Sequence, residues 1–205
     1  MLIFIGTGMI IIDDYTLEIG HFGICFSFGL TVSLAIYFLG NISGAHINPA
    51  VTIAFWVAKK FRKKDVLPYI LFQILGAITA SSLLFIIFPG TNTMGETIIL
   101  DNNYLKTFIL EFIITFILMF VILYVSSRSY QNTISGIAIG GTVFICSIFV
   151  GPITGSSMNP ARTIAPALFT NLEHIWIYIT SSILGAIFSV FIYCKIKKPN
   201  PLQHY

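Results

Sequence analysis

The sequence has few charged residues and few cysteines. Only 9% of its 205 residues are charged, whereas 56% are hydrophobic; in soluble domains about a quarter of the residues are charged. The chain is therefore predicted to be an integral membrane protein. Its net charge of +3 comes with basic residues grouped between apolar segments, a pattern that argues against nucleic-acid binding. We expect the lipid bilayer, and no nucleic acid, among its partners.

The three cysteines, Cys25, Cys146 and Cys194, lie in apolar runs and form no C-x-x-C motif. They predict neither a disulfide framework nor a metal site, and no sequence feature calls for a cofactor. An intramembrane enzyme would need a nucleophile with a nearby base. Ser43 and His46 are a weak coincidence of spacing, so we predict that the chain is not an enzyme.

Apolar runs of about 20 residues can cross a bilayer as helices. The first apolar run, residues 1–12, is only about 18 Å long as a helix, against a hydrocarbon core of roughly 30 Å. We interpret it as the outer half of a first helix whose beginning lies outside this chain, ended by the polar residues 13–18. The predicted full spans are residues 19–39, 66–88, 105–125, 133–150 and 175–194.

Two further segments, residues 48–58 and 159–169, have helical character but are too short to cross. We expect each to dip into the membrane and return. Irregular backbone cannot face lipid, because its N–H and C=O groups would lack partners. The two segments are therefore predicted to meet inside the helix bundle.

The same pattern, [S/T]-G-x-x-x-N-P-A-x-T, begins both at Ser43 and at Thr154, 111 positions apart. The same offset aligns Gly29-Leu-Thr-Val32 with Gly140-Gly-Thr-Val143. We therefore predict a single transmembrane channel domain, residues 1–205, built from two homologous repeats, 1–103 and 104–205. Three spans in each repeat place the two halves in opposite orientations, an inverted-topology repeat.

Basic and acidic residues are sorted by the predicted spans. Lys and Arg are enriched on the cytoplasmic side of membrane proteins, so the side rich in them is predicted to be cytoplasmic. That side holds Lys59, Lys60, Arg62, Lys63, Lys64, Arg128, Lys195, Lys197 and Lys198, and the other holds Asp13, Asp14, Glu18, Glu96, Asp101 and Glu173.

Two short helices that begin at Asn48 and Asn159 would point their N-termini at each other near the midplane. Each N-terminus carries about half a positive charge, which repels cations but not neutral hydrogen-bonding solutes. The Asn side chains could donate to such a solute and the preceding carbonyls could accept from it. The predicted central constriction is Asn48, Pro49, Ala50, Asn159, Pro160 and Ala161, and the predicted carbonyls are those of Gly44, Ala45, His46, Gly155, Ser156 and Ser157.

With its paired Asn-Pro-Ala boxes in inverted repeats, the chain resembles the aquaporin or major intrinsic protein family over residues 3–193, in motif style the nodulin-like members and their bacterial relatives. The resemblance implies an all-α bundle of six membrane helices with two re-entrant half-helices, the first helix being truncated here. It also implies one pore per subunit, a homotetramer, and a multi-pass location in the inner or plasma membrane with both termini of the full-length form cytoplasmic.

The resemblance also implies an outer selectivity filter formed by Phe28, Ser147, Ser156 and Arg162. Arg162 has an independent argument, since an arginine inside a membrane is costly and is usually functional or paired. Strict water channels of this family typically place His where this chain has Ser147. The filter is therefore expected to be wider than a water-only filter.

These residues favour a passive channel for water and small uncharged solutes of the glycerol, urea or metalloid-acid type, which excludes ions and protons. Glycerol facilitators, however, carry Asp where this chain has Thr163, so a strict water channel stays open as an alternative. An ion-coupled secondary transporter is a third possibility. It would require titratable groups inside the membrane, and Glu111 is the single acidic residue in the predicted spans.

We also predict roles for three more polar residues. The resemblance implies that Glu111 accepts hydrogen bonds from backbone amides of a re-entrant loop, although a carboxylate inside a span could also relay protons. Gln73 is interpreted as a helix-packing residue within Gln73-x-x-Gly-Ala77. His46 is either a gate that responds to protonation or a loop histidine bound by its surroundings.

Overall fold

The computed structural model describes residues 1–91, 93–100, 102–128 and 130–197, and in these ranges every regular element is a helix. Five helices, α2, α4, α5, α6 and α8, are long and apolar enough to cross a membrane, which confirms the five predicted full spans. The helices are α1 (Leu2–Thr16), α2 (Gly20–Ser43), α3 (Pro49–Val57), α4 (Lys63–Ile87), α5 (Tyr104–Ser126), α6 (Asn132–Thr154), α7 (Pro160–Ala167) and α8 (Ile175–Ile196).

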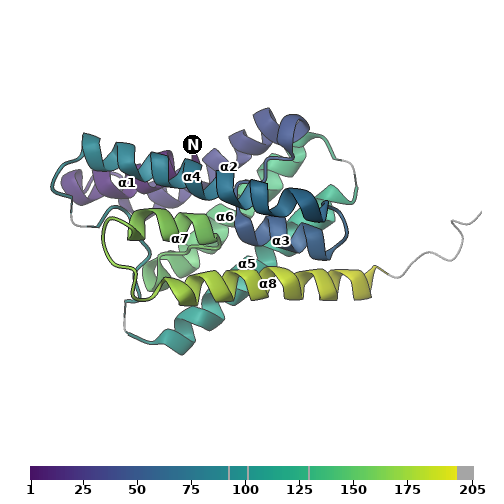
Figure 1. Cartoon of the computed structure of the whole chain (residues 1–205). Helices are drawn as coiled ribbons and strands as arrows, with labels where there is room; N and C mark the ends of the chain where they lie inside the picture. The colour runs from purple at the N-terminus through teal and green to yellow at the C-terminus, as the bar shows by residue number, and fades with distance from the viewer. Residues whose placement is uncertain (92, 101, 129, 198–205) are drawn as a thin grey trace, which may run out of the picture.

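The long helices run side by side, and the short helices α3 and α7 lie between them (Figure 1). Helices α3 and α7 extend toward opposite ends of the bundle, so their N-terminal ends face each other near its middle. Helix α5 packs along α8, while α2 packs along α6, α3 against α8, and α4 against α7. Elements from the first and second halves of the chain therefore interlock around the two short helices.

The α2–α6 contact is centred on the glycines that the repeat aligns. A Cβ atom at Gly29 would lie 2.7 Å from the carbonyl oxygen of Gly140, and one at Gly140 would lie 2.3 Å from that of Gly29. Next to them, the Ser33 hydroxyl donates to the carbonyl of Gly136 at 2.9 Å. In a membrane, helices gain stability from such close approach of small residues, since lipid removes the hydrophobic driving force between them.

Three predicted boundaries were wrong, and the first is the end of α2, which runs to Ser43 and not to residue 39. Helix α1 continues through Asp13 to Thr16, where we had placed a polar break. The helix ends with Leu17 as its C-cap, which is left-handed (φ 57°) and donates its N–H to the carbonyl of Asp13, while the Asp13 carboxylate accepts from the N–H groups of Ile19 and Gly20. The chain thus turns directly from α1 into α2.

Helix α6 also runs past its predicted end at Val150, through Pro152, to Thr154. A proline in a helix leaves the carbonyl four residues earlier without its partner, here that of Ile148. The His21 ring at the start of α2 supplies a replacement, with Nε2 3.0 Å from that oxygen. Sequence periodicity could not reveal this compensation, because the donor is 127 positions away.

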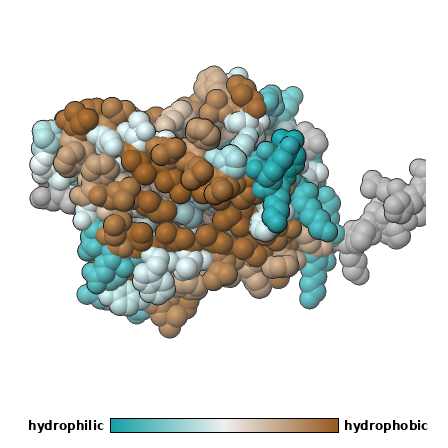
Figure 2. Space-filling model, in the orientation of Figure 1, coloured by the Kyte–Doolittle hydropathy of each residue, from teal (hydrophilic) through white to brown (hydrophobic). Residues whose placement is uncertain are grey.

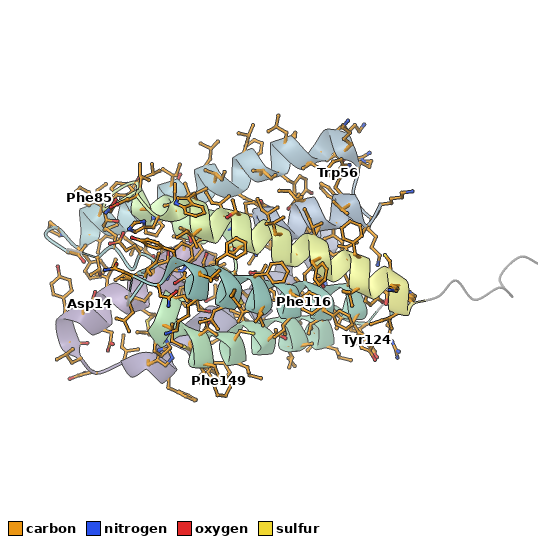
Figure 3. All side chains as sticks on the ribbon, turned by 90° about the horizontal axis from the view of Figure 1, so that it is seen from below. Asp14, Trp56, Phe85, Phe116, Tyr124 and Phe149 are labelled. Atoms are coloured by element: carbon orange, nitrogen blue, oxygen red, sulfur yellow. The ribbon has the colours of Figure 1, made fainter. Side chains whose placement is uncertain are left out.

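The two ends of the bundle differ in charge. Trp56 and Tyr124 lie toward the end of the bundle at which α8 ends, and Asp14 and Phe85 toward the other (Figure 3). A broad hydrophobic surface separates more hydrophilic ends (Figure 2). The predicted basic residues lie at the first end and the predicted acidic residues at the second, except that Lys198 and Asp101 lie outside the described residues.

Candidate functional site

The short helices α3 and α7 begin in the same way. In each, an extended asparagine, Asn48 or Asn159, precedes a proline at the first helical position. The Asn48 Oδ1 atom accepts from the N–H of Ala50 at 2.9 Å, and Asn159 Oδ1 accepts from that of Ala161 at 3.0 Å. Asparagine is a favoured cap and proline a favoured first residue, because together they satisfy or remove orphan N–H groups.

The asparagine amide nitrogens connect the two loops to each other. Asn48 Nδ2 donates to the carbonyl of Met158 at 2.7 Å, and Asn159 Nδ2 donates to that of Ile47 at 3.0 Å. We had expected these amides to donate to a solute. Each NH₂ group has two protons, so one proton connects the loops and one is left for another acceptor.

The loops before the short helices repeat an unusual backbone conformation. Gly44 and Ala45 in the first loop have φ of 73° and 50°, and Gly155 and Ser156 in the second have 75° and 43°. Left-handed conformations are costly for residues other than glycine and cluster at functional sites. The repeated motif therefore starts both loops with the same strained pair, and the second loop adds Met158 (φ 52°), whose equivalent Ile47 is not left-handed.

Glu111 on α5 holds the second loop. Its side chain is fully buried. Oε1 accepts from the N–H of Ser157 at 2.9 Å and from the Thr154 hydroxyl at 2.6 Å, while Oε2 accepts from the N–H of Met158 at 3.0 Å. A carboxylate whose lone pairs are used in this way anchors backbone, which is the geometry expected of loop support.

Gln73 on α4 holds the first loop by different chemistry. Its Nε2 donates to the carbonyl of His46 at 2.7 Å and to the Thr52 hydroxyl at 2.9 Å. Our interpretation of Gln73 as a packing residue missed this role. The sequence did contain one signal for this role: the Gln73 side-chain amide lies inside a membrane span, and we had predicted no hydrogen-bond partner for it on its own helix. The His46 ring in turn stacks on Phe55, with ring centroids 4.9 Å apart.

A cavity of about 260 Å³ follows these two loops. Apolar side chains of α2, α5 and α6 form one wall, and the loop backbones, Asn48, Asn159 and Arg162 form the other. Ser135 and Ser147 of α6 also border the cavity, so polar groups are not confined to one wall. The apolar wall is Val32, Ile36, Leu118, Ile122, Ile139 and Val143.

The four predicted filter residues all border this cavity. The guanidinium carbon of Arg162 lies 5.2 Å from the centroid of the Phe28 ring. The Ser147 hydroxyl donates to the Ser156 hydroxyl at 3.2 Å. One aromatic ring, one guanidinium and two small hydroxyls are therefore brought together from α2, α6, α7 and the loop before α7.

Arg162 is 2% exposed and is positioned by a loop that sequence reasoning did not identify. Its NH1 group donates to the carbonyl of Gly95 at 2.6 Å, in the connection between α4 and α5. Its Nε atom has no hydrogen-bond partner among the described residues. This nitrogen is itself buried, so the guanidinium is held mainly by the bond to Gly95, and burial without a partner marks the group as a costly one to place inside a membrane.

The same connection reaches the second motif through another contact that we did not predict. The Thr97 hydroxyl donates to that of Thr163 at 3.3 Å, and Thr163 donates to the Ser157 hydroxyl at 2.7 Å. Tyr178 on α8 donates to the carbonyl of Thr154 at 2.8 Å. No motif marks Gly95, Thr97 or Tyr178, because their roles depend on which loop folds over which.

Some predicted residues do not border the cavity. Gly155 ends α6, and a Cβ there would lie 3.0 Å from the Cα of Thr97. Cys146, whose direction the sequence left open, packs in the core. Of the predicted carbonyl residues, Gly44, Ala45, His46, Ser156 and Ser157 do border it. Within the central boxes, the asparagines border it, and Pro49, Ala50, Pro160 and Ala161 are buried behind them.

A sequence model of the family described as "Major intrinsic protein" matches residues 1–193. Nodulin-26 from Glycine max is 40% identical over 195 residues, which cover 94% of this chain and 72% of that protein. Aquaporin NIP6-1 from Arabidopsis thaliana is 40% identical over 203 residues, covering 98% and 66%. Aquaporin NIP1-2 from the same plant is 36% identical over 184 residues, covering 85% and 63%.

Among solved structures, the X-ray structure of the aquaglyceroporin from Plasmodium falciparum superposes with a TM-score of 0.87. The aligned region covers 95% of this chain and 90% of that one, at 24% sequence identity. The similarity confirms the predicted fold, an all-helical bundle of the same architecture.

Proposed function

Since the chain belongs to the major intrinsic protein family, whose members are channels rather than enzymes, we propose that it conducts water together with small uncharged solutes and excludes ions and protons. The solutes would be of the glycerol, urea or undissociated metalloid-acid type. The observation that carries this proposal is the group of Phe28, Ser147, Ser156 and Arg162 around one cavity. Two serines leave room there that a larger side chain would fill.

Ion exclusion would follow from the positive charge at the centre and at the filter. The N-termini of α3 and α7 face each other across the contacts between Asn48 and Met158 and between Asn159 and Ile47. Each contributes about half a positive charge, and Arg162 adds a full one. A cation that enters this path loses bound water beside the apolar wall and is repelled by the positive potential. A neutral solute is not repelled by that potential.

The remaining assignments extend the same proposal. Both repeats, 1–103 and 104–205, would contribute one half-helix each, α3 and α7, to a single pore. The chain would lie in the inner or plasma membrane. The end that carries Lys59, Lys195 and Lys197 would face the cytoplasm, because basic residues are enriched on that side. Four copies would assemble as a homotetramer, as the family resemblance implies.

Stopped-flow light scattering on proteoliposomes tests the solute range. We expect fast shrinkage in an impermeant osmolyte, and rapid re-swelling when the osmolyte is glycerol or urea. Fast water flow with glycerol and urea excluded would overturn the wide filter and favour a strict water channel. Solute uptake driven uphill by a proton or sodium gradient would instead establish a coupled transporter.

Replacement of Arg162 by valine tests the exclusion of charge. We expect proton or ion leak to rise by about tenfold or more, because a barrier change of about 1.4 kcal/mol alters a rate tenfold. Arg128→Val is the matched control, since Arg128 is exposed just after the C-terminal end of α5 and stacks on Tyr124. An unchanged leak in Arg162→Val liposomes that still conduct water would remove Arg162 from the filter.

A further inference from the structure

The turn between α3 and α4 forms a basic hollow on the surface. Five of its six residues from position 59 to 64 are Lys or Arg. The hollow has a volume of about 400 Å³. It is lined by Trp56, Lys59, Lys60, Phe61, Arg62 and Lys63.

The positive charge of this hollow is largely uncompensated. Arg62 pairs with Asp65, with 2.5 Å between Nε and Oδ2. In the described part of the chain, none of Lys59, Lys60 and Lys63 makes an ion pair. Basic side chains gathered over a small area create a local potential that favours an anion.

The backbone of the turn holds these side chains in a defined arrangement. The N–H of Lys60 donates to the carbonyl of Phe55, and the N–H of Lys59 donates to that of Trp56, both at 2.9 Å. This is the double hydrogen bond that closes many helices, and its left-handed position usually holds glycine. Here Lys59 occupies it, with φ 57°, so a strained position carries a charge.

The surroundings of the hollow place it at the level of lipid headgroups. Trp56 is 40% exposed and lies at the end of the bundle where α8 ends (Figure 3). Tryptophan concentrates at membrane interfaces. From the same turn, α4 leads into the membrane with exposed leucines at successive turns, Leu67, Leu71 and Leu75. An anionic headgroup and an acyl chain would thus find adjoining surfaces.

We propose that this hollow binds the phosphate of an anionic phospholipid, with the acyl chain along the exposed face of α4. The lysines Lys59, Lys60 and Lys63 contact the phosphate, and Trp56 packs beside the glycerol region. A free phosphate ion shares the charge but would use none of the apolar surface. The site lies on the outside of the bundle and does not depend on which solute the cavity conducts.

Fluorescence of Trp56 provides the test. The full chain carries two tryptophans, so Trp176→Phe leaves Trp56 as the only reporter. The protein is reconstituted in mixtures in which either phosphatidylglycerol or phosphatidylcholine bears brominated, quenching acyl chains. We expect stronger quenching by brominated phosphatidylglycerol at equal mole fraction. Equal quenching by the two lipids would overturn the proposal.

A matched pair of double variants identifies the residues. Lys60→Gln with Lys63→Gln is expected to reduce the preference for phosphatidylglycerol by about fivefold for each lysine removed. Lys195→Gln with Lys197→Gln removes the same charge at the same end, from α8, and is expected to retain the preference. An equal loss in the two variants would show a general surface effect and refute a site.

Two measurements on the chain with unaltered lysines keep the test independent of whether the variants fold. The preference must fall as sodium chloride rises, since ionic contacts are screened. A preference insensitive to salt contradicts the proposal. Inorganic phosphate at constant ionic strength should leave the quenching unchanged, whereas its displacement of the lipid at millimolar concentration would identify a free-anion site instead.

Discussion

Replacement of Gly6 by alanine should narrow the proposed filter from behind. A Cβ atom at Gly6 in α1 would lie 2.3 Å from Cε1, 2.5 Å from Cζ and 2.6 Å from Cδ1 of the Phe28 ring. Carbon atoms in contact are about 3.5–4.0 Å apart. The ring must therefore move away from α1 by about 1 Å or more. Its other surroundings include the cavity and Arg162, 5.2 Å from the ring centroid.

A shift of this size matters more for glycerol than for water. We expect glycerol permeability to fall by about tenfold or more, equivalent to about 1.4 kcal/mol in barrier height, with a smaller fall for water. The ratio of the two permeabilities is therefore the informative quantity. Extra volume in a packed core also costs about 1–3 kcal/mol of stability, so thermal unfolding in detergent should begin at a lower temperature.

Gly8→Ala is the control, because it makes the same change two positions along α1. Its Cβ would approach Leu84 Cδ2 at 3.2 Å, a flexible side chain that does not border the cavity. Both variants are compared with the unaltered chain by stopped-flow light scattering, with water and glycerol fluxes normalised to reconstituted protein. If the glycerol-to-water ratio is the same in Gly6→Ala and Gly8→Ala, Phe28 does not limit passage and our reasoning about the filter is wrong.

Three further outcomes are expected. Glu111→Gln should lose about 1–3 kcal/mol of stability, because an NH₂ group would face a backbone N–H that now donates to the carboxylate; thermal unfolding matching that of the unaltered chain would contradict the loop-support role. Gln73→Leu should lower water flux and cost about 1 kcal/mol by releasing the carbonyl of His46, and unchanged flux would show that the first loop holds without it. Burial raises the pKa of Glu96, in the connection between α4 and α5, despite the hydrogen bond from Thr170. A raised pKa means that this carboxyl favours folding when protonated and loses that contribution as pH rises through its folded pKa. Glu96→Gln should therefore have the same melting temperature as the unaltered chain near pH 4 and a higher one near pH 7. If the melting temperature of the variant minus that of the unaltered chain falls between pH 4 and pH 7, this assignment is wrong.

The sequence by itself determined the class of fold and the position of the two half-helices. Long apolar runs can only be helices in a membrane, and Asn before Pro starts a helix through local hydrogen bonds. The repeat offset of 111 also predicted that Gly29 and Gly140 are equivalent. These conclusions rest on interactions within a few residues or on internal repetition, which a single sequence contains.

Only the tertiary structure decided how the loops are held and which groups line the cavity. The contacts that position the site join residues far apart in the chain: Arg162 with Gly95, Glu111 with Met158, and His21 with Ile148. Each depends on the path of a connecting loop or the register of two packed helices, and local sequence pattern specifies neither. The same holds for the asparagine amides, whose donors proved to be shared between the opposite loop and the cavity.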